Sequence, residues 1–240
     1  MASSVSQQYY NYSDGGKVFM TEIVSLLEDI EFASVLEIGS GKYPCLSANF
    51  VRQHKITYSV LDIDKDDLLE LQHNNSHLSE VIHHDISESL NTEKRYDLII
   101  SKFIWEHVED ISSFHQNIHS LLRTGGYAVH YFPCLGAFPF FVNHILPESV
   151  SENLLNLVNK RDKEKYPVYY EWCVGPSRSS IQRLEENSYQ VLKYYGFFGH
   201  NYYKRNFLLL DVLERAKSKF LEFVRLSKFC SYAMVVLKKS

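Results

Sequence analysis

This sequence of 240 residues has few cysteines, no excess of basic residues and no long apolar run. The four cysteines are scattered and form no C-x-x-C pair, so we expect buried or free thiols in a reducing cytosol. The formal net charge of -4 lacks the basic excess typical of nucleic-acid-binding proteins, so we expect no nucleic-acid partner.

Membrane-spanning and secretory segments are also missing. The longest apolar stretch, residues 135–146, is interrupted by Pro139 and Asn143 and is shorter than the roughly 20 residues of a membrane span. Residues 1–13 are polar and lack the basic and apolar regions of a signal peptide. We therefore expect a cytoplasmic protein without a membrane span, a monomer or homodimer, whose residues 1–240 form a single domain.

What the sequence does contain is a regular alternation of strand-like and helix-like segments. Apolar runs predict strands at residues 33–38, 57–62, 80–85, 95–101 and 127–132, with helices between them. Asp110 is expected to cap the helix that begins at residue 111, and Gly125 with Gly126 to end it. Two further strands, near 189–195 and 231–238, complete a Rossmann-like, doubly wound α/β fold with a mostly parallel seven-stranded sheet.

The alternation stops after the fifth strand. Residues 134–177 are irregular and rich in aromatic side chains, and we expect a largely helical insertion that caps the carboxyl edge of the sheet. The side chains expected to line a substrate pocket are Tyr131, Phe138, Phe141, His144, Tyr169 and Trp172.

A glycine motif, Val-Leu-Glu-Ile-Gly-Ser-Gly at residues 35–41, ends the first of these strands. Glycines there let backbone amides approach a ligand closely, at the edge where open α/β sheets bind nucleotides. Position 44, where a dinucleotide fingerprint has its third glycine, is Pro44, so a pyrophosphate cradle is poorly supported. Glu37 instead suits a cofactor with a cationic amino-acid end.

Two more acids follow the next two strands. Asp62 closes the strand at 57–62, where a carboxylate can accept hydrogen bonds from ribose hydroxyls; it could instead cap the following helix. Asp85 lies at the end of the strand at 80–85 and is placed to meet an adenine amino group.

Six segments, taken in order and spacing, resemble the motif series of the class I S-adenosylmethionine (SAM)-dependent methyltransferases, and most of all their small-molecule branch. They are the glycine motif, Val-Leu-Asp at 60–62, His-Asp-Ile at 84–86, Tyr-Asp-Leu-Ile-Ile-Ser at 96–101, Trp-Glu-His-Val-Glu-Asp at 105–110 and Leu-Leu-Arg-Thr-Gly-Gly at 121–126. The resemblance covers residues 30–133, and beyond them it gives little guidance.

The resemblance implies that SAM is the cofactor and that S-adenosylhomocysteine (SAH) is its product. It implies that the glycine loop binds the methionine part of SAM and that the acid after the second strand binds the ribose. The residue beside that acid and the residues after the third strand would contact the adenine, and the end of the fourth strand would line the methyl-donor side. The matching residues are Glu37, Gly39, Ser40, Gly41, Asp62, Ile63, Asp85, Ile86, Ser101 and Phe103.

Methyl transfer to a hydroxyl or protonated amine also requires removal of a proton, and a histidine is an efficient base for this. His107, shortly after the fourth strand, is our first candidate, although it could merely fix the start of the next helix. His130, Tyr131 and His144 are alternatives. No acidic pair or H-E-x-x-H motif indicates a metal.

The prediction is therefore an enzyme that transfers a methyl group from SAM to an oxygen or nitrogen of a small-molecule acceptor. A nicotinamide-dependent oxidoreductase shares the strand, the glycine loop and the second-strand acid, but Pro44 and the lack of a Tyr-x-x-x-Lys pair count against it. A non-catalytic partner subunit with the same fold is the third reading.

Overall fold

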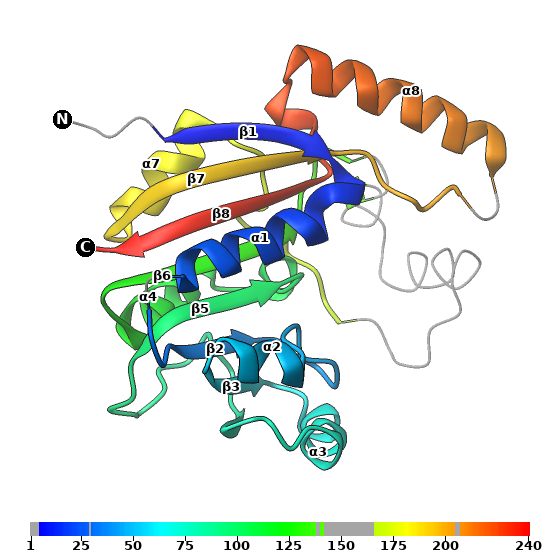
Figure 1. Cartoon of the computed structure of the whole chain (residues 1–240). Helices are drawn as coiled ribbons and strands as arrows, with labels where there is room; N and C mark the ends of the chain where they lie inside the picture. The colour runs from blue at the N-terminus through cyan, green and yellow to red at the C-terminus, as the bar shows by residue number, and fades with distance from the viewer. Residues whose placement is uncertain (1–4, 29, 138–139, 142–165, 205–206) are drawn as a thin grey trace.

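The computed structural model describes residues 5–28, 30–137, 140–141, 166–204 and 207–240. Its centre is a sheet in the order β1-β7-β8-β6-β5-β2-β3-β4 (Figure 1). The strands are β1 (Ser6–Asn11), β2 (Ser34–Ile38), β3 (Thr57–Asp62), β4 (Glu80–His83), β5 (Tyr96–Lys102), β6 (Leu122–Pro133), β7 (Tyr189–Phe198) and β8 (Tyr232–Lys239).

The sheet is mostly parallel, as expected. Only β8 runs against its neighbours, since it pairs antiparallel with both β6 and β7. The expected number of strands is wrong by one within the described residues, because β1 adds an eighth strand that pairs parallel with β7 at the edge. Its sequence, SQQYYN, is polar and no residue of it is fully buried, so it carries no apolar pattern that would predict a strand.

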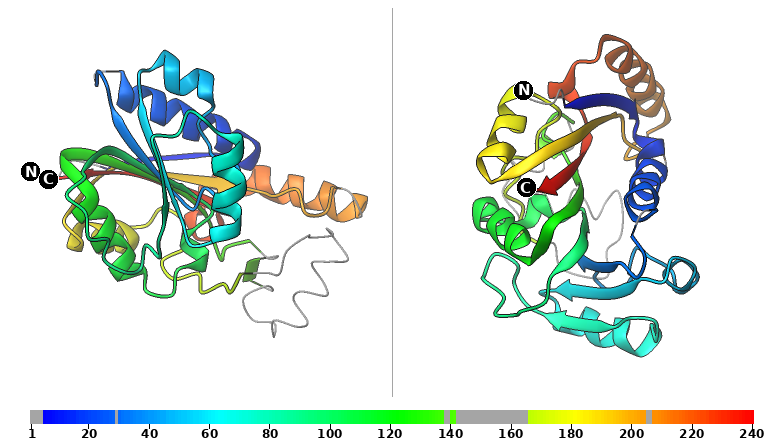
Figure 2. Two further views of the ribbon diagram at one scale, coloured as in Figure 1. Left: turned by 90° about the horizontal axis from the view of Figure 1, so that it is seen from below. Right: turned by 60° about the vertical axis from the view of Figure 1, so that its left-hand side comes forward.

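Helices cover both faces of the sheet (Figure 2). Apolar side chains of α1 (Gly15–Leu27), α2 (Ala48–Gln53) and α3 (Lys65–Asn74) pack into the core on one face. On the other face, α4 (Ile111–Leu121) and α7 (Arg178–Glu186) contribute to a second core. Helix α8 (Leu208–Val224) packs at the edge of the sheet, beside β1 and β7.

The helix predicted after Asp110 begins where expected but ends before the expected glycines. The Asp110 side chain accepts a hydrogen bond from the Ser113 amide (2.9 Å) and caps α4. The helix ends at Leu121, and Gly125 and Gly126 lie inside β6, where the pairing with β5 changes register. Gly125 has a φ of +79°, which suits the irregularity, so these glycines bend a strand rather than end a helix.

Three short 3-10 helices, η1 (Tyr12–Asp14), η2 (Trp105–His107) and η3 (Ser227–Phe229), complete the elements of the described residues. Much of the insertion at 134–177 lies outside the described residues, including Phe138 and His144, so its helical content stays a prediction. The four cysteines are free, as expected. No helix within the described ranges has the length and apolar character needed to cross a bilayer.

Candidate functional site

The glycine motif forms a tight loop directly after β2. Gly39 and Gly41 have φ angles of +73° and +51°, which side chains with a Cβ rarely adopt. The amide of Gly39 donates to the carbonyl oxygen of Leu61 (2.7 Å), and this bond continues the pairing of β2 with β3. A Cβ on Gly39 would lie 1.9 Å from Cδ1 of Ile104, so the loop packs tightly against the segment after β5.

Asp62, at the end of β3, holds the glycine loop by a hydrogen bond. Its Oδ2 accepts from the Gly41 amide (2.6 Å), and its Oδ1 accepts from the Asp64 amide (2.9 Å). Asp64, rather than Asp62, caps α3, because its side chain accepts from the amides of Asp66 and Asp67. The hydrogen bonds therefore do not support the alternative that Asp62 is only a helix cap. Ile63 beside it is 56% exposed and offers apolar surface next to the carboxylate.

Glu37 lies underneath the loop and is almost fully buried. Its Oε2 accepts from the Cys45 amide (2.9 Å) and from the hydroxyl of Tyr58 on β3. Burial raises the pKa of the Glu37 carboxyl, although these hydrogen bonds oppose the shift. The role of Tyr58 could not be predicted from the sequence, because a buried strand tyrosine carries no signal that distinguishes it from core packing. Ser40 in the loop is buried and donates to the Gly41 carbonyl oxygen (3.2 Å).

The third-strand residues lie further from these contacts. Strand β4 ends at His83, and Asp85 follows in a turn where it accepts from the Ser87 amide (2.8 Å). Ile86 is 6% exposed and belongs to the core on the face covered by α4. Asp85 is thus available at a turn, whereas Ile86 is mainly a packing residue.

The end of β5 brings together several of the expected side chains. Ser101 is buried, and its hydroxyl oxygen lies 2.8 Å from Nδ1 of His130, which is also fully buried. Phe103 has a φ of +61° and is partly exposed, with its ring 5.0 Å from that of Tyr131. Phe103 therefore offers apolar surface at the sheet edge, while Ser101 holds the buried ring of His130 by a hydrogen bond.

Tyr131 lies close to the N-terminus of α1. A Cβ on Gly15 would lie 2.2 Å from the Tyr131 hydroxyl oxygen, so only glycine fits there without displacement. Tyr131 is buried, and burial raises the pKa of its hydroxyl. Among the other expected substrate residues, Phe141 is 47% exposed.

His107 lies in η2, just beyond β5. Its Nδ1 is 2.7 Å from the carbonyl oxygen of Pro167, so this nitrogen carries a proton and donates. In the neutral ring, Nε2 is then the basic nitrogen. Tyr166, one residue before Pro167, donates from its hydroxyl to Asp64 Oδ2 (2.6 Å). The end of the insertion thus spans from η2 to the start of α3 at the carboxyl edge.

Glu106, next to His107, is a titratable group that no sequence pattern marks as part of a site. Its carboxyl is buried, and burial raises its pKa to about 8. Oε1 lies 3.8 Å from Nε2 of His107, and Oε2 has no hydrogen-bond partner within the described part of the chain. The Glu106 carbonyl oxygen accepts from the Tyr169 amide (2.7 Å), which ties the insertion to η2.

Trp172 lies elsewhere. Its ring stacks on that of His115 in α4 (5.4 Å between centroids), and the Arg183 guanidinium of α7 lies 5.3 Å from its centre. These contacts belong to the core behind β6 and do not bring Trp172 to the residues at the carboxyl edge. Aromatic composition alone could not distinguish a pocket wall from this packing.

Comparison with known proteins places this arrangement in a family. A methyltransferase-domain model matches residues 14–208. No curated protein matches the sequence significantly.

Solved structures share the fold at low identity. An S-adenosylmethionine-dependent methyltransferase from Clostridium acetobutylicum superposes with a TM-score of 0.57 at 13% identity, covering 96% of this chain and 92% of that one. The N-methyltransferase NodS from Bradyrhizobium japonicum, in complex with SAH, has a TM-score of 0.53 at 12% identity, covering 93% and 86%. A cyclopropane synthase from Mycobacterium tuberculosis has a TM-score of 0.53 at 14% identity, covering 92% and 84%.

Proposed function

The chain belongs to the methyltransferase-domain family and is a SAM-dependent methyltransferase, and we propose that its acceptor is an oxygen or nitrogen of a small molecule. The observation that carries this proposal is the orientation of His107 at the end of β5. A histidine whose Nδ1 is fixed by a carbonyl presents Nε2 as a base, which is useful when a hydroxyl or ammonium must lose a proton. The name of NodS also refers to nitrogen methylation.

The residues around the glycine loop fit the cofactor that we assign to them. Around Gly41, an added Cβ would meet no atom closer than Asp67 Oδ2 at 3.7 Å, so ligand atoms can approach the backbone there. Each oxygen of Asp62 accepts one backbone hydrogen bond and can accept another, so the carboxylate can also receive ribose hydroxyls. We assign the adenine side to Ile63 and the turn at Asp85.

We assign Glu37 to the charged end of the cofactor. A nearby ammonium favours the ionised carboxylate and would oppose the effect of burial on the Glu37 pKa. The Tyr58 and Cys45 bonds hold this carboxylate under Gly39, Ser40 and Gly41.

SAM supplies an already activated methyl group, so most of the protein's contribution is positioning. In our proposal, Phe103 and Tyr131 form the apolar floor on the acceptor side, and His107 takes the acceptor's proton at Nε2. The part of the insertion from Tyr166 to Tyr169 closes the edge above η2 and restricts water. The whole chain then acts as one domain, with 134–177 as a cap.

A two-part experiment tests this proposal. First, SAH at 100 times its dissociation constant should raise the free energy of unfolding by about 2.7 kcal/mol, while NAD should not. Second, the protein is incubated with methyl-labelled SAM and a cell extract, which is then separated by filtration into small molecules and macromolecules. Label in the small-molecule fraction that is lost with the Asp62→Ala variant supports the proposal. Label in protein or nucleic acid would contradict it, and stabilisation by NAD alone would favour the oxidoreductase.

A further inference from the structure

Helix α8 turns its polar side towards the protein and its apolar side outwards. The buried residues of α8 are Asp211, Glu214, Ser218 and Leu221. Three of these four are polar, and they are held by local bonds such as Asp211 to Arg215 (2.6 Å) and Glu214 to Lys217 (2.5 Å). A surface helix normally buries its apolar side, so this orientation is the reverse of the usual one.

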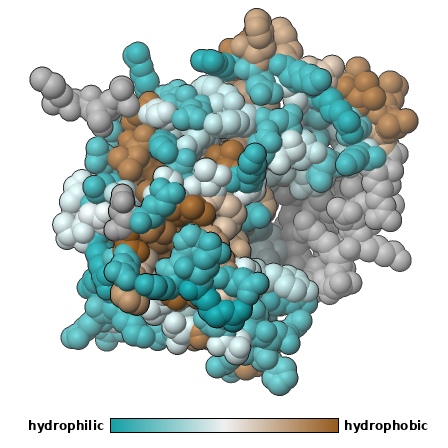
Figure 3. All heavy atoms as spheres, in the orientation of Figure 1, coloured by the Kyte–Doolittle hydropathy of each residue, from teal (hydrophilic) through white to brown (hydrophobic). Residues whose placement is uncertain are grey.

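The outer face is strongly apolar. Phe223 is 85% exposed, and Phe220 and Leu213 are 62% and 57% exposed. Figure 3 shows hydrophobic groups at the upper right of the molecule, over the position that α8 has in Figure 1. We call this the α8 face; it comprises Leu208, Leu209, Val212, Leu213, Ala216, Phe220, Phe223 and Val224. Contiguous exposed apolar surface of this kind marks a site of interaction.

The charges around the α8 face are mainly positive. In the described residues 204 and 207–228 there are six cationic side chains and three acidic ones, although the whole chain has a net charge of -4. Two of the three acids, Asp211 and Glu214, are buried on the inner side, where they pair with Arg215 and Lys217, so the positive excess comes from the other cations, such as Lys219. The outer side therefore combines leucine and phenylalanine with lysine, as in helices that lie in the interface of an anionic membrane.

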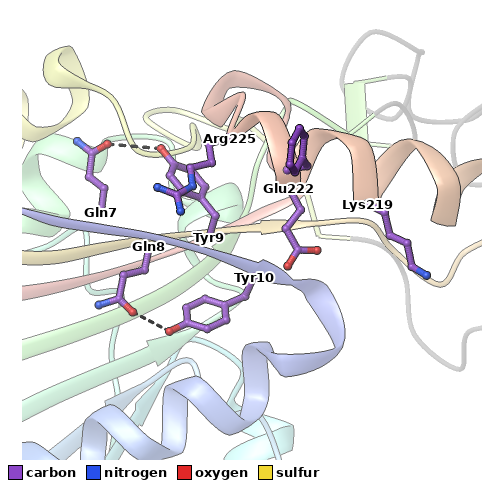
Figure 4. A pocket seen from close by; sticks show the side chains of 8 residues that line it. Gln7, Gln8, Tyr9, Tyr10, Lys219, Glu222 and Arg225 are labelled. Atoms are coloured by element: carbon purple, nitrogen blue, oxygen red, sulfur yellow. Dashed lines mark hydrogen bonds between the residues drawn. The ribbon is translucent and has the colours of Figure 1, made fainter.

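A groove beside α8 extends this basic surface. It has a volume of about 700 Å³ and lies between β1 and α8, with two cationic side chains, Lys219 and Arg225, and one acidic side chain, Glu222, on the helix side (Figure 4). On the strand side, the Tyr10 hydroxyl donates to Gln8 (2.6 Å). None of the residues that we assign to SAM lines this groove, so it is not the cofactor site.

We propose that α8 docks the protein on an anionic lipid bilayer, with the α8 face in the apolar boundary and the lysines at the headgroups. A second copy of the chain fits less well, because a twofold contact would place the same lysines of both copies together. α8 begins beyond the carboxyl end of β7, at the same edge of the sheet as the glycine loop. Docking therefore keeps the methyl-transfer site near the membrane surface.

Co-sedimentation of the full chain with lipid vesicles tests the proposal. The protein should bind vesicles that contain phosphatidylglycerol and bind pure phosphatidylcholine vesicles at least tenfold less. The Leu213→Gln/Phe220→Gln variant should bind more than tenfold less, because two buried apolar side chains are lost. Lys219→Gln should weaken binding about fivefold, the equivalent of about 1 kcal/mol per charge near the surface. Leu69→Gln on α3 is the matched control, since Leu69 is as exposed (57%) as Leu213.

The same variants distinguish the other ways to cover this face. Failure of the wild-type protein to bind phosphatidylglycerol vesicles overturns the proposal. A dimer in sedimentation analysis that Leu213→Gln/Phe220→Gln converts to a monomer identifies a second copy as the occupant. A melting temperature lowered by several degrees in this variant, but not in Leu69→Gln, means that the chain itself covers the face. An unchanged melting temperature together with lost vesicle binding supports the proposal.

Discussion

The backbone amide of Gly41 donates a 2.6 Å hydrogen bond to Oδ2 of Asp62, which joins the glycine loop after β2 to the end of β3. Both partners lie at the edge of the sheet where parallel strands end, although they are 21 residues apart in the sequence. The acid and the loop are therefore held in one arrangement before a ligand arrives, which lowers the entropic cost of binding.

Replacing Asp62 tests this arrangement. Asp62→Ala removes acceptors for the ribose and for the Gly41 amide, so SAH affinity should fall roughly ten- to hundredfold, as for a lost hydrogen bond to a charged group. Titration calorimetry with SAH measures this change, with Asp66→Ala on the exposed side of α3 as the control. Equal affinities in the two variants would remove Asp62 from the site.

The packing of Gly39 against Ile104 predicts a steric effect. Gly39→Ala should lower the melting temperature, because the alanine needs a left-handed backbone and its Cβ overlaps the Ile104 side chain. Adding Ile104→Ala should recover part of the loss. Gly16→Ala, at a helical position with no atom within 4 Å of the new Cβ, should be neutral or stabilising. If the double variant is no more stable than Gly39→Ala alone, the backbone conformation carries the whole effect.

His107→Asn tests the proposed base. The asparagine amide nitrogen takes the place of Nδ1 and can still donate to the Pro167 carbonyl, but the side chain has no titratable nitrogen. The catalytic rate should therefore fall roughly 10²–10⁴-fold while SAH affinity and melting temperature stay unchanged. The remaining activity should lose the pH dependence that the histidine imposes. His73→Asn on α3 is the control. A fall of only a few fold would show that positioning is sufficient without this base.

Glu106 predicts a pH dependence of stability. Its folded-state pKa of about 8 lies above the ordinary value of 4.5, so between these values the native state binds more protons than the unfolded state. The free energy of unfolding that this group contributes therefore decreases as the pH rises from about 4.5 to about 8. Glu106→Gln removes the effect, and its melting temperature relative to wild type should rise across this range. If the melting temperatures of Glu106→Gln, wild type and the exposed-site control Glu109→Gln change equally with pH over this range, the prediction is contradicted.

The sequence predicted those elements whose conformation is favoured both by their own residues and by their packing in the fold. The apolar run at 95–101 became β5, and Asp110 capped α4, because a buried strand and a helix start are encoded by adjacent residues. β1 could not be predicted, since its strand conformation depends on pairing with β7, which is far away in the sequence. For α8, the sequence does not show which side of the helix faces the protein, because that is decided by partners such as His200, whose Nε2 lies 3.5 Å from Glu214.

The position of β8 has a consequence for the order of folding. This strand comes last in the sequence, yet it lies between β6 and β7 and holds β7 and β1 to the rest of the sheet. During synthesis, β2 to β6 can pair as they emerge, whereas β7 has no place in the sheet until residues 232–239 are made. Among the described strands, β1 therefore has to wait longest for its partner, because Ser6 pairs with Lys193.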